Sequence, residues 1–381
     1  MLIFFYIVLF FLLVYGFLID YYRRSWNRIP YYKRPESVIS GQTVFVTVIV
    51  PARNEEKNIS NCLRSLIAQV YPLDRFEIIV VDDYSTDQTA SIIKNFNHPS
   101  IKLIRLEDEV AGGIVNSYKK KALELAIAVA KGEWIMTTDA DCVLPPHWIA
   151  CMSALYHKQQ AAFVAAPVKI SSNSSLLSIF QSLDFVSLQG ITGASVFRKI
   201  HSMCNGANLG YQKKIFLEVD GFRGIDHIAS GDDMFLMYKI SKRYPDKIFF
   251  LKDPDAIVTT APAENWPAFF KQRIRWASKT GHYQDQHITK ILFFVWILNA
   301  SILFFLIAGL WNPVDLIYFL ALWLIKTLVE FSFVSTVARF FGQQRLMPFF
   351  FFLEPLHIIY TVIAGAFGKL GSYEWKGRRV K

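Results

Sequence analysis

The segment WIMTTDAD, residues 134–141, predicts a strand that ends in two carboxylates. The apolar run Trp134 to Thr138 is typical of a buried strand, and Asp139-Ala140-Asp141 follows at its carboxyl end. Between about Thr43 and Gln284, short β-branched runs alternate with stretches of helical periodicity. Such alternation indicates βαβ units, so we expect an α/β domain with a mainly parallel sheet.

The expected strands place polar residues at one edge of this sheet. In a parallel sheet, ligands bind beyond the carboxyl ends of the strands. Three groups follow expected strands and are predicted to converge on one crevice: Pro51-Ala52-Arg53, Asp82-Asp83 and Asp139-Ala140-Asp141. The expected strands are residues 44–50, 76–81, 101–106 and 134–138, and the expected helices are residues 54–69 (capped by Asn54), 87–96, 119–130 and 178–195.

Two carboxylate motifs at strand ends are candidates for ligand binding. Asp139 and Asp141 stand two residues apart and face the same way, and two carboxylates together with phosphate and water oxygens can hold Mg²⁺. The alternative is that they only cap the next helix. At the earlier strand end, Asp82 and Asp83 can accept hydrogen bonds from a base or ribose, while Ser85 or Thr86 together with Asp87 can cap the helix that follows.

A third acidic motif, Gly231-Asp232-Asp233, precedes an apolar helix that is expected to begin at Met234. The N-terminus of a helix stabilises a carboxylate in its ionised form. An ionised Asp233 could therefore take a proton from an acceptor hydroxyl as a general base. A simple capping box is the alternative.

The segment QRIRW lies in an amphipathic stretch just before an apolar span. Gln272, Arg275 and Trp276 share one helix face and offer an amide, a guanidinium suited to a diphosphate and an aromatic surface for a sugar. The alternative is an interfacial membrane helix with snorkelling Arg side chains, which the segment alone favours. Lys271 and Arg273, on other faces, are expected to serve that interfacial role.

The composition predicts a membrane protein. The 381 residues carry a net charge of +10, and basic residues flank apolar segments. This favours an anionic membrane surface over nucleic acid, for which no motif is present. Residues 1–19 are uncharged and lead into Asp20-Tyr21-Tyr22-Arg23-Arg24, which indicates an uncleaved anchor helix with the next domain in the cytoplasm. The four cysteines form no CxxC pair, so reduced thiols are expected.

Two or three further membrane helices are expected within residues 291–311, 316–337 and 347–367. Lys326 and Glu330 lie four residues apart and can pair on one helix face. Three full crossings would place the basic C-terminal tail outside the cytoplasm, against the positive-inside bias. A re-entrant or interfacial segment is therefore an alternative to one of these crossings.

Read in order, five short motifs resemble the membrane-bound members of glycosyltransferase family 2, which include cellulose, chitin and hyaluronan synthases and ceramide glucosyltransferases. The resemblance covers roughly residues 43–278. The motifs are VIVPARNE at residues 48–55, Asp82-Asp83, Asp139-Ala140-Asp141, Gly231-Asp232-Asp233 and Gln272-x-x-Arg275-Trp276.

The resemblance implies a GT-A fold and an inverting, single-displacement transfer from a nucleotide-diphosphate sugar, with Mg²⁺ or Mn²⁺ as cofactor. The residues that match the family's donor and nucleotide contacts are Pro51, Arg53, Glu55, Asp82, Asp83, Lys119 and Asp139. The matching metal ligands are Asp139 and Asp141, and Asp233 matches the general base. The residues that match diphosphate and acceptor contacts are Asp232, Cys204, Asn205, Gly206, Gln272, Arg275 and Trp276.

Together these features predict a multi-pass protein of the inner or plasma membrane. Its expected reaction moves a sugar from a nucleotide-diphosphate donor such as a UDP-sugar to a membrane lipid or lipid-linked glycan, giving a β-linkage. Four spans at most leave little material for a secretion channel, so a small processive polysaccharide synthase, aided by homo-oligomerisation, is the alternative. A non-catalytic membrane scaffold is the alternative from another class.

The predicted divisions of the chain are a membrane anchor (1–20), a basic juxtamembrane linker (21–42), a cytoplasmic catalytic domain (43–262), an amphipathic interface helix (263–288), C-terminal membrane segments (289–368) and a basic tail (369–381).

Overall fold

The computed structural model describes residues 1–32, 43–109, 117–201, 203–228, 230–279, 286–368, 373–375 and 378–380. Residues 33–42 of the predicted linker and residues 369–372, 376, 377 and 381 of the predicted tail lie outside the described part. The chain forms two compact units. The α/β unit comprises Ile29–Lys169, Ser195–Ala261 and Glu374–Lys381, and the helical unit comprises Met1–Arg28, Ile170–Ala194 and Pro262–Tyr373.

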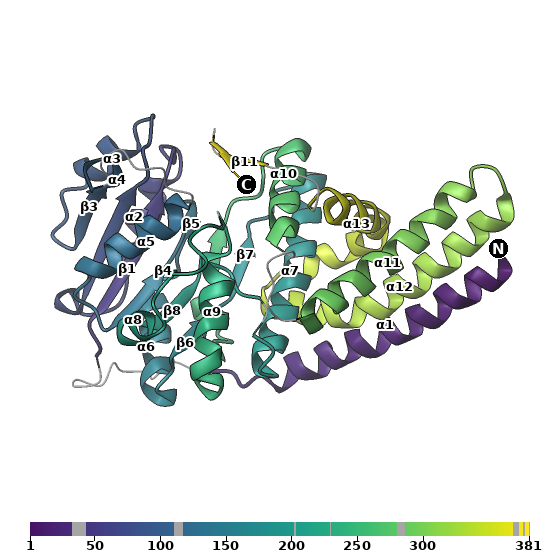
Figure 1. The fold of residues 1–381 in the computed structure, drawn as a ribbon, viewed down its shortest axis with the longest axis horizontal. Coiled ribbons are helices and arrows are strands. Elements are labelled where there is room, and N and C mark those ends of the chain that lie inside the picture. The colour runs from purple at the N-terminus through teal and green to yellow at the C-terminus, as the bar shows by residue number, and fades with distance from the viewer. Residues whose placement is uncertain are drawn as a thin grey trace. The chain divides into compact units, whose positions relative to one another are not determined.

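A seven-stranded sheet in the order β3-β2-β1-β4-β8-β6-β9 forms the core of the α/β unit (Figure 1). Its strands are β1 (Val46–Ala52), β2 (Phe76–Asp82), β3 (Ile101–Arg105), β4 (Trp134–Thr137), β6 (Phe163–Ala165), β8 (Leu209–Gln212) and β9 (Ile248–Phe250). β1 is parallel to β2 and β4, and β2 is parallel to β3, whereas β8 runs antiparallel to β4 and β6. The predicted α/β class with a mainly parallel sheet is confirmed.

The central strands are mostly apolar and buried. Val46, Val48, Ile49 and Val50 of β1 are all fully buried, as expected for strands covered on both faces of a parallel sheet. In the register of the sheet, Ala52 lies opposite Asp82 of β2, and Ile49 lies opposite Thr137 of β4. The carboxyl ends of β1, β2 and β4 therefore meet at one edge.

Helices and a second small sheet complete the α/β unit. The helices are α2 (Ile59–Ile67), α3 (Thr89–Asn95), α4 (Leu106–Glu109), α5 (Tyr118–Val129), α6 (Trp148–Gln159), α8 (Lys213–Glu218) and α9 (Asp232–Arg243), with single 3-10 turns at Leu73–Arg75, Pro245–Lys247 and Pro254–Ala256. The small sheet has the order β5-β10-β7, with β5 (Cys142–Val143), β10 (Val258–Thr260) and β7 (Val168–Ile170). Two short strands near the C-terminus, β11 (Tyr373–Trp375) and β12 (Arg378–Val380), pair with each other.

The prediction that Asn54 caps the first helix is wrong. Asn54 has a φ of 49°, a left-handed conformation that cannot begin a helix, and α2 starts only at Ile59. Its side-chain oxygen instead accepts a hydrogen bond from the backbone N–H of Thr86 at 2.8 Å. The N-cap residue of α3 is Gln88, whose side chain makes no capping hydrogen bond. Asp87 lies one residue earlier, and its Oδ1 accepts the backbone N–H of Thr89 at 3.0 Å.

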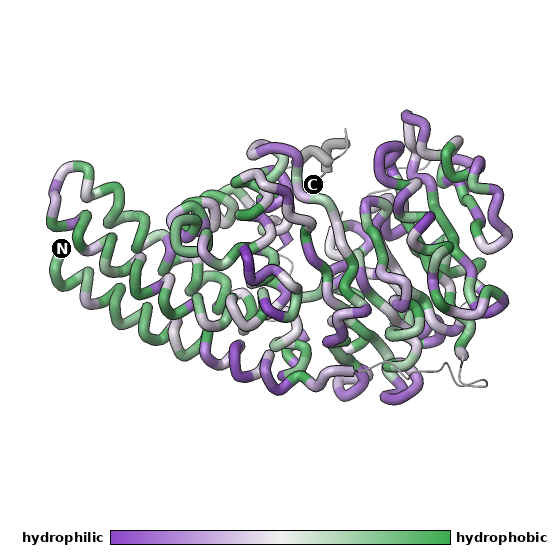
Figure 2. Tube along the Cα trace, turned by 180° about the vertical axis from the view of Figure 1, so that it is seen from behind, coloured by the Kyte–Doolittle hydropathy of each residue, from purple (hydrophilic) through white to green (hydrophobic). Residues whose placement is uncertain are grey.

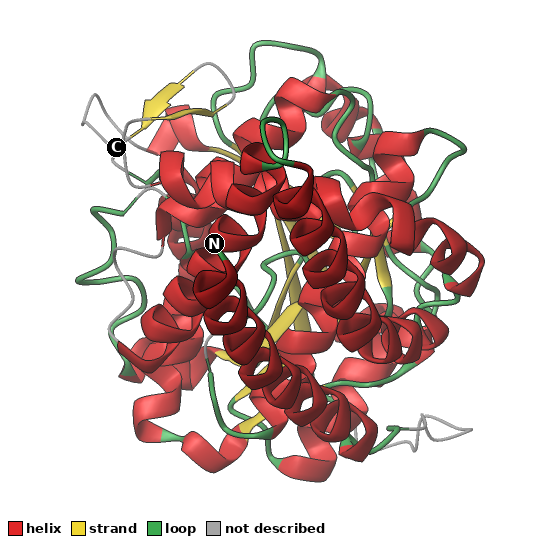
Figure 3. Cartoon of the chain, turned by 90° about the vertical axis from the view of Figure 1, so that its right-hand side faces the viewer, coloured by secondary structure: helices red, strands yellow, loops and turns green. Residues whose placement is uncertain are grey.

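The helical unit is built from helices, red in Figure 3, most of which are long and apolar and therefore largely green in Figure 2. They are α1 (Leu2–Arg28), α7 (Leu176–Phe197, up to Ala194 in this unit), α10 (Trp266–Ser278), α11 (Gln286–Ala308), α12 (Pro313–Phe340), a 3-10 turn at Gln344–Leu346 and α13 (Met347–Gly368). Within the described residues, four helical segments are long and apolar enough to cross a membrane, Leu2–Arg28, Ile288–Ala308, Pro313–Phe340 and Gln344–Gly368.

A glycine brings α7 close to α12. A Cβ placed on Gly190 would lie only 2.6 Å from Val337 Cγ2 and 2.7 Å from Phe333 Cζ. Helices in apolar surroundings approach in this way where a small residue lets the backbones come together. The predicted helix at residues 178–195 is therefore present, and it packs against a membrane-length helix.

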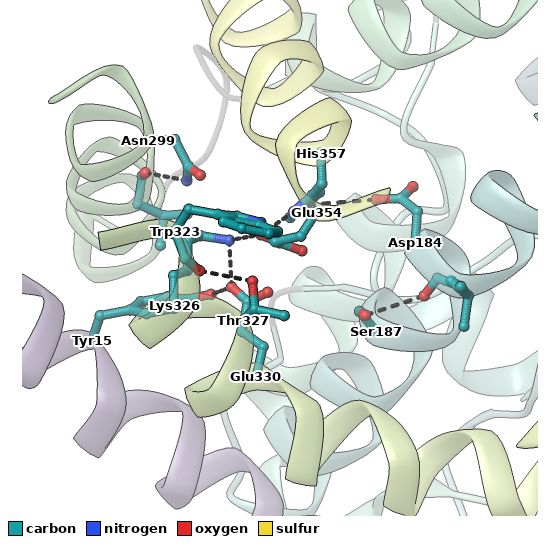
Figure 4. Close-up of polar contacts among 12 residues, drawn as sticks. Tyr15, Asp184, Ser187, Asn299, Trp323, Lys326, Thr327, Glu330, Glu354 and His357 are labelled. Atoms are coloured by element: carbon teal, nitrogen blue, oxygen red, sulfur yellow. Dashed lines mark hydrogen bonds and ion pairs between the residues drawn. The ribbon is translucent and has the colours of Figure 1, made fainter. Parts of the chain in front are cut away.

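A buried ionic network joins the helices of this unit (Figure 4). Lys326 Nζ lies 2.7 Å from Glu330 Oε1, which confirms the predicted pair, and it also contacts the carboxylate of Glu354 on α13. The Tyr15 hydroxyl on α1 donates to Glu330. His357 Nδ1 continues the network 3.5 Å from Glu354 Oε1. Since the Lys326 ammonium already contacts both carboxylates, we interpret the group Glu330, Glu354 and His357 as an ion-pair network rather than a metal site.

Replacing the central cation of this network is expected to destabilise the protein strongly. Lys326→Met leaves two buried carboxylates close together without a counter-charge, at a cost of about 3–5 kcal/mol in unfolding free energy. Denaturant unfolding of the purified protein in detergent measures this change. Lys290→Met, at an exposed position on α11, is the matched control, and an equal effect of the two substitutions would contradict a stabilising role for Lys326.

Candidate active site

The segments that follow β1 and β2 are joined by hydrogen bonds to backbone carbonyl oxygens. Arg53 Nη1 donates to the carbonyl oxygens of Asp83 at 2.7 Å and Tyr84 at 2.9 Å. The backbone N–H of Asp83 donates to Ala52 O at 2.8 Å. Pro51, still within β1, lies opposite Val81. The Arg53 guanidinium therefore fixes the edge of the sheet where the sequence predicts a nucleotide.

The carboxylates of Asp82 and Asp83 are buried at the carboxyl end of β2. Asp82 is 1% exposed and Asp83 is 3% exposed. Among the described residues, the Oδ1 atom of Asp82 has no hydrogen-bond partner. A buried acceptor without a donor is costly, so this oxygen is suited to a hydrogen-bond donor from a ligand.

Asp139 and Asp141 follow β4, as predicted. Asp141 Oδ2 accepts a hydrogen bond from Thr260 Oγ1 at 3.2 Å. Burial raises the pKa of Asp141 to about 6, with further contributions from the charges of Asp139 and Glu55. Glu55 itself is held by Asn58, whose Nδ2 donates to Glu55 Oε2 at 2.9 Å. Carboxylate oxygens are the ligands that a hard divalent ion such as Mg²⁺ or Mn²⁺ prefers, so Asp139 and Asp141 are the residues that could hold one here.

Lys119 at the start of α5 links the acidic motifs. Its Nζ lies 2.7 Å from Asp139 Oδ1 and 3.6 Å from Asp232 Oδ2. Burial lowers the pKa of Lys119, but the carboxylates of Asp139 and Asp232 outweigh burial and raise it overall, so the ammonium stays charged. Asp139 and Asp232, far apart in the sequence, thus share one cation.

Gly206 lies against the same cluster. Its backbone N–H donates to Asp233 Oδ2 at 3.0 Å, and its carbonyl accepts from Thr137 Oγ1 of β4 at 3.0 Å. A Cβ on Gly206 would lie 3.3 Å from Lys119 Nζ, so a side chain would crowd the cluster. Next to it, Asn205 Oδ1 accepts the N–H of Ala207 at 3.0 Å, and Cys204 is partly exposed.

The start of α9 holds Asp233 in place. Gly231 has a φ of +78°, and a Cβ there would lie 2.6 Å from Phe235 Cε2, so no other residue fits easily. Asp233 Oδ1 accepts the backbone N–H of Met234 at 2.8 Å. The Asp233 carboxylate is partly exposed. Its two hydrogen bonds keep it at the N-terminus of α9 beside Gly206, and a general base needs such a fixed position.

The residues Gln272, Arg275 and Trp276 lie on α10 in the helical unit. All three are partly exposed, and Gln272 Oε1 accepts a hydrogen bond from Arg273 Nη1 at 3.3 Å. Their predicted contacts with diphosphate or acceptor stay a prediction.

The interfacial role predicted for Arg273 is wrong. Arg273 is 3% exposed, its Nη2 lies 2.7 Å from Asp184 Oδ2 on α7, and its guanidinium stacks 4.2 Å from the Trp276 ring and 4.8 Å from the Phe269 ring. Aromatic residues four positions before and three positions after Arg273 share its helix face. This spacing is the sequence feature that could have indicated its burial.

The mainly parallel sheet, with acidic residues beyond its carboxyl edge, has the GT-A fold. The glycosyl transferase family 2 model matches residues 47–219, and the glycosyl transferase family group 2 model matches residues 134–365. The chain belongs to glycosyltransferase family 2, as the sequence motifs predict.

Relatives and a solved structure agree with this assignment. The probable glycosyltransferase YdaM of Bacillus subtilis is 29% identical over 240 residues, 61% of this chain and 54% of the relative. The poly-beta-1,6-N-acetyl-D-glucosamine synthase of Staphylococcus epidermidis is 27% identical over 263 residues, 68% of this chain and 59% of the relative. The chain thus spans little more than half the length of these two relatives.

The solved mannosyltransferase PcManGT of Pyrobaculum calidifontis, in complex with GDP-Man and Mn²⁺, shares the fold. It has a TM-score of 0.58 and 20% identity, and the match covers 95% of this chain and 98% of that chain.

Proposed function

We propose that this protein transfers a sugar from a nucleotide-diphosphate donor to an acceptor hydroxyl with inversion of configuration. One observation carries the proposal. Lys119 bridges Asp139 and Asp232, while Gly206, which lies against Lys119, holds Asp233. A site suited to a diphosphate thereby adjoins a carboxylate suited to accept a proton.

The donor is proposed to bind at the ends of β1, β2 and β4. The free Oδ1 of Asp82 would accept a hydrogen bond from the base or ribose, with Asp83 beside it, and Pro51, Arg53 and Glu55 would line the nucleotide loop. Asp139 and Asp141 would hold Mg²⁺ or Mn²⁺, which would offset charge on the leaving diphosphate. PcManGT, bound to GDP-Man and Mn²⁺, supports a divalent ion.

Asp233 is proposed as the general base. It accepts the proton of the acceptor hydroxyl while the hydroxyl oxygen attacks the anomeric carbon from the face opposite the diphosphate. The bond from the anomeric carbon to the diphosphate oxygen breaks, and the nucleoside diphosphate leaves with the electron pair. Lys119 contributes positive charge near the leaving group, and an α-linked donor gives a β-linked product.

The acceptor is proposed to be a membrane lipid or a lipid-linked saccharide. The four apolar helices would keep the protein in the inner or plasma membrane, and the basic residues at the C-terminal end of α1 favour a cytoplasmic catalytic domain. The second candidate, processive synthesis of a polysaccharide, is favoured by the similarity to poly-beta-1,6-N-acetyl-D-glucosamine synthase over 68% of the chain.

A donor screen tests the proposal against a non-catalytic scaffold. Purified protein in detergent is incubated with a panel of UDP- and GDP-sugars and with Mn²⁺ or Mg²⁺, and release of nucleoside diphosphate is measured. We expect slow release from one donor that stops when the metal is chelated. If no donor is hydrolysed or transferred in the presence of membrane lipids, the scaffold explanation replaces this proposal.

A further inference from the structure

The loop that leads into Gly231-Asp232-Asp233 is held by a buried lysine. Lys120 on α5 is 2% exposed, although it stands between the partly exposed Lys119 and Lys121. Its Nζ donates to the carbonyl oxygens of Ile225 at 2.7 Å and Ser230 at 3.2 Å and also to that of Ile228. An ammonium has three N–H donors, and among the described residues three of its acceptors are carbonyls of this loop.

The same cation reaches the first turn of α9. Lys120 Nζ lies 6.0 Å from the centre of the Phe235 ring, and this ring packs under Gly231. Lys120 therefore contacts both the loop before Asp232 and the ring below it. A lysine is rarely this buried unless its charge is compensated, so the loop carbonyls and the ammonium depend on each other.

A second lysine holds the earlier part of the loop. Lys239 Nζ on α9 donates to the carbonyls of Gly221 at 2.7 Å and Arg223 at 3.0 Å. Lys239 is partly exposed, whereas Lys120 is buried and binds the half of the loop that ends at the catalytic motif. Lys239 thus binds carbonyl oxygens in the first half of the loop, and Lys120 binds those in the second half.

We propose that Lys120 is a positioning residue that fixes Asp233, and through it the acceptor hydroxyl, by holding the carbonyls of Ile225, Ile228 and Ser230. The effect on catalysis rests on the function proposed above, whereas the effect on the loop does not. Lys119, its neighbour, contacts the Asp139 carboxylate instead. Adjacent lysines on α5 thus serve the donor side and the acceptor side of one reaction.

Hydrogen exchange of the full-length protein tests the structural part. In Lys120→Met, amides of residues 225–231 are expected to exchange on the order of tenfold faster, because their segment loses several charge-assisted hydrogen bonds. Lys121→Met is the matched control and should leave that exchange unchanged, and Lys239→Met should affect residues 220–224 more than residues 225–231. Unchanged exchange in Lys120→Met would overturn the proposal.

Steady-state kinetics test the catalytic part. Lys120→Met is expected to lower kcat by about 10- to 100-fold through misplacement of the base, with the donor KM within about twofold of the wild type. A faster-exchanging loop with unchanged kcat would refute positioning. If the wild type itself turns over no donor, the proposed function fails while the exchange result still decides the role of the loop. If Lys120→Met does not fold, Lys120→Gln replaces it, because its side chain keeps two N–H donors. Smaller changes in exchange and in kcat are then expected, and unchanged values of either would overturn the proposal in the same way.

Discussion

Asp233→Asn is expected to lower the kcat of sugar transfer by about 10²- to 10⁴-fold, because an amide cannot take the proton of the acceptor hydroxyl. The substitution preserves the size of the side chain, and an amide oxygen can still accept the N–H of Gly206 or Met234 that the carboxylate now accepts. The loss therefore reports on proton transfer rather than on folding.

Donor binding separates this effect from a damaged site. Calorimetric titration of Asp233→Asn with the nucleoside diphosphate and Mn²⁺ should give a Kd within about twofold of the wild type, since the donor contacts are proposed to lie at the ends of β1, β2 and β4. Asp246→Asn, an exposed change in the 3-10 turn Pro245–Lys247 and outside that loop, is the matched control. Transfer by Asp233→Asn at the rate of this control would assign the base to another residue.

Removing the charge of Asp141 is the second large effect that we expect. Asp141→Asn should lower the transfer rate by about two to three orders of magnitude, because charge on the leaving diphosphate would be less well offset. It should also raise the Mn²⁺ concentration needed for half-maximal activity by about 10- to 100-fold. A metal titration of initial rates measures both quantities.

The control for this substitution is Asp255→Asn, an exposed aspartate in the 3-10 turn before β10. Its activity and metal requirement should equal those of the wild type. If Asp141→Asn kept the wild-type metal requirement, the ion would have to be held by other ligands, and the burial that raises the pKa of Asp141 would have only a structural meaning.

Much of the arrangement of the candidate site could be predicted, because its acidic residues come directly after strands. Once the alternation of strands and helices indicates a parallel sheet, Asp83 and Asp139 must lie at the same edge. The sequence motifs assign Asp139 and Asp232 to the same expected site. Only the structure shows that the Lys119 ammonium contacts both carboxylates.

Other features could not be predicted because their partners are distant in the sequence. Lys326 and Glu330 share a helix face, which local spacing predicts, but Glu354 joins them from another helix. Lys120 looks like one member of an exposed basic run until the loop carbonyls that surround it are known. Successive helix positions point about 100° apart, so three consecutive lysines on one helix indicate that one side chain can face inward, though not which one.

We propose that this protein transfers a sugar from a nucleotide donor to a lipid acceptor. The most direct test incubates membranes containing the wild type, and separately Asp233→Asn, with a radiolabelled sugar nucleotide and Mn²⁺, followed by extraction with organic solvent. We predict that label passes into an organic-extractable glycolipid with a β-linked sugar in the wild type only. Label retained as a long polymer in the aqueous phase, or equal transfer by both proteins, would contradict the claim.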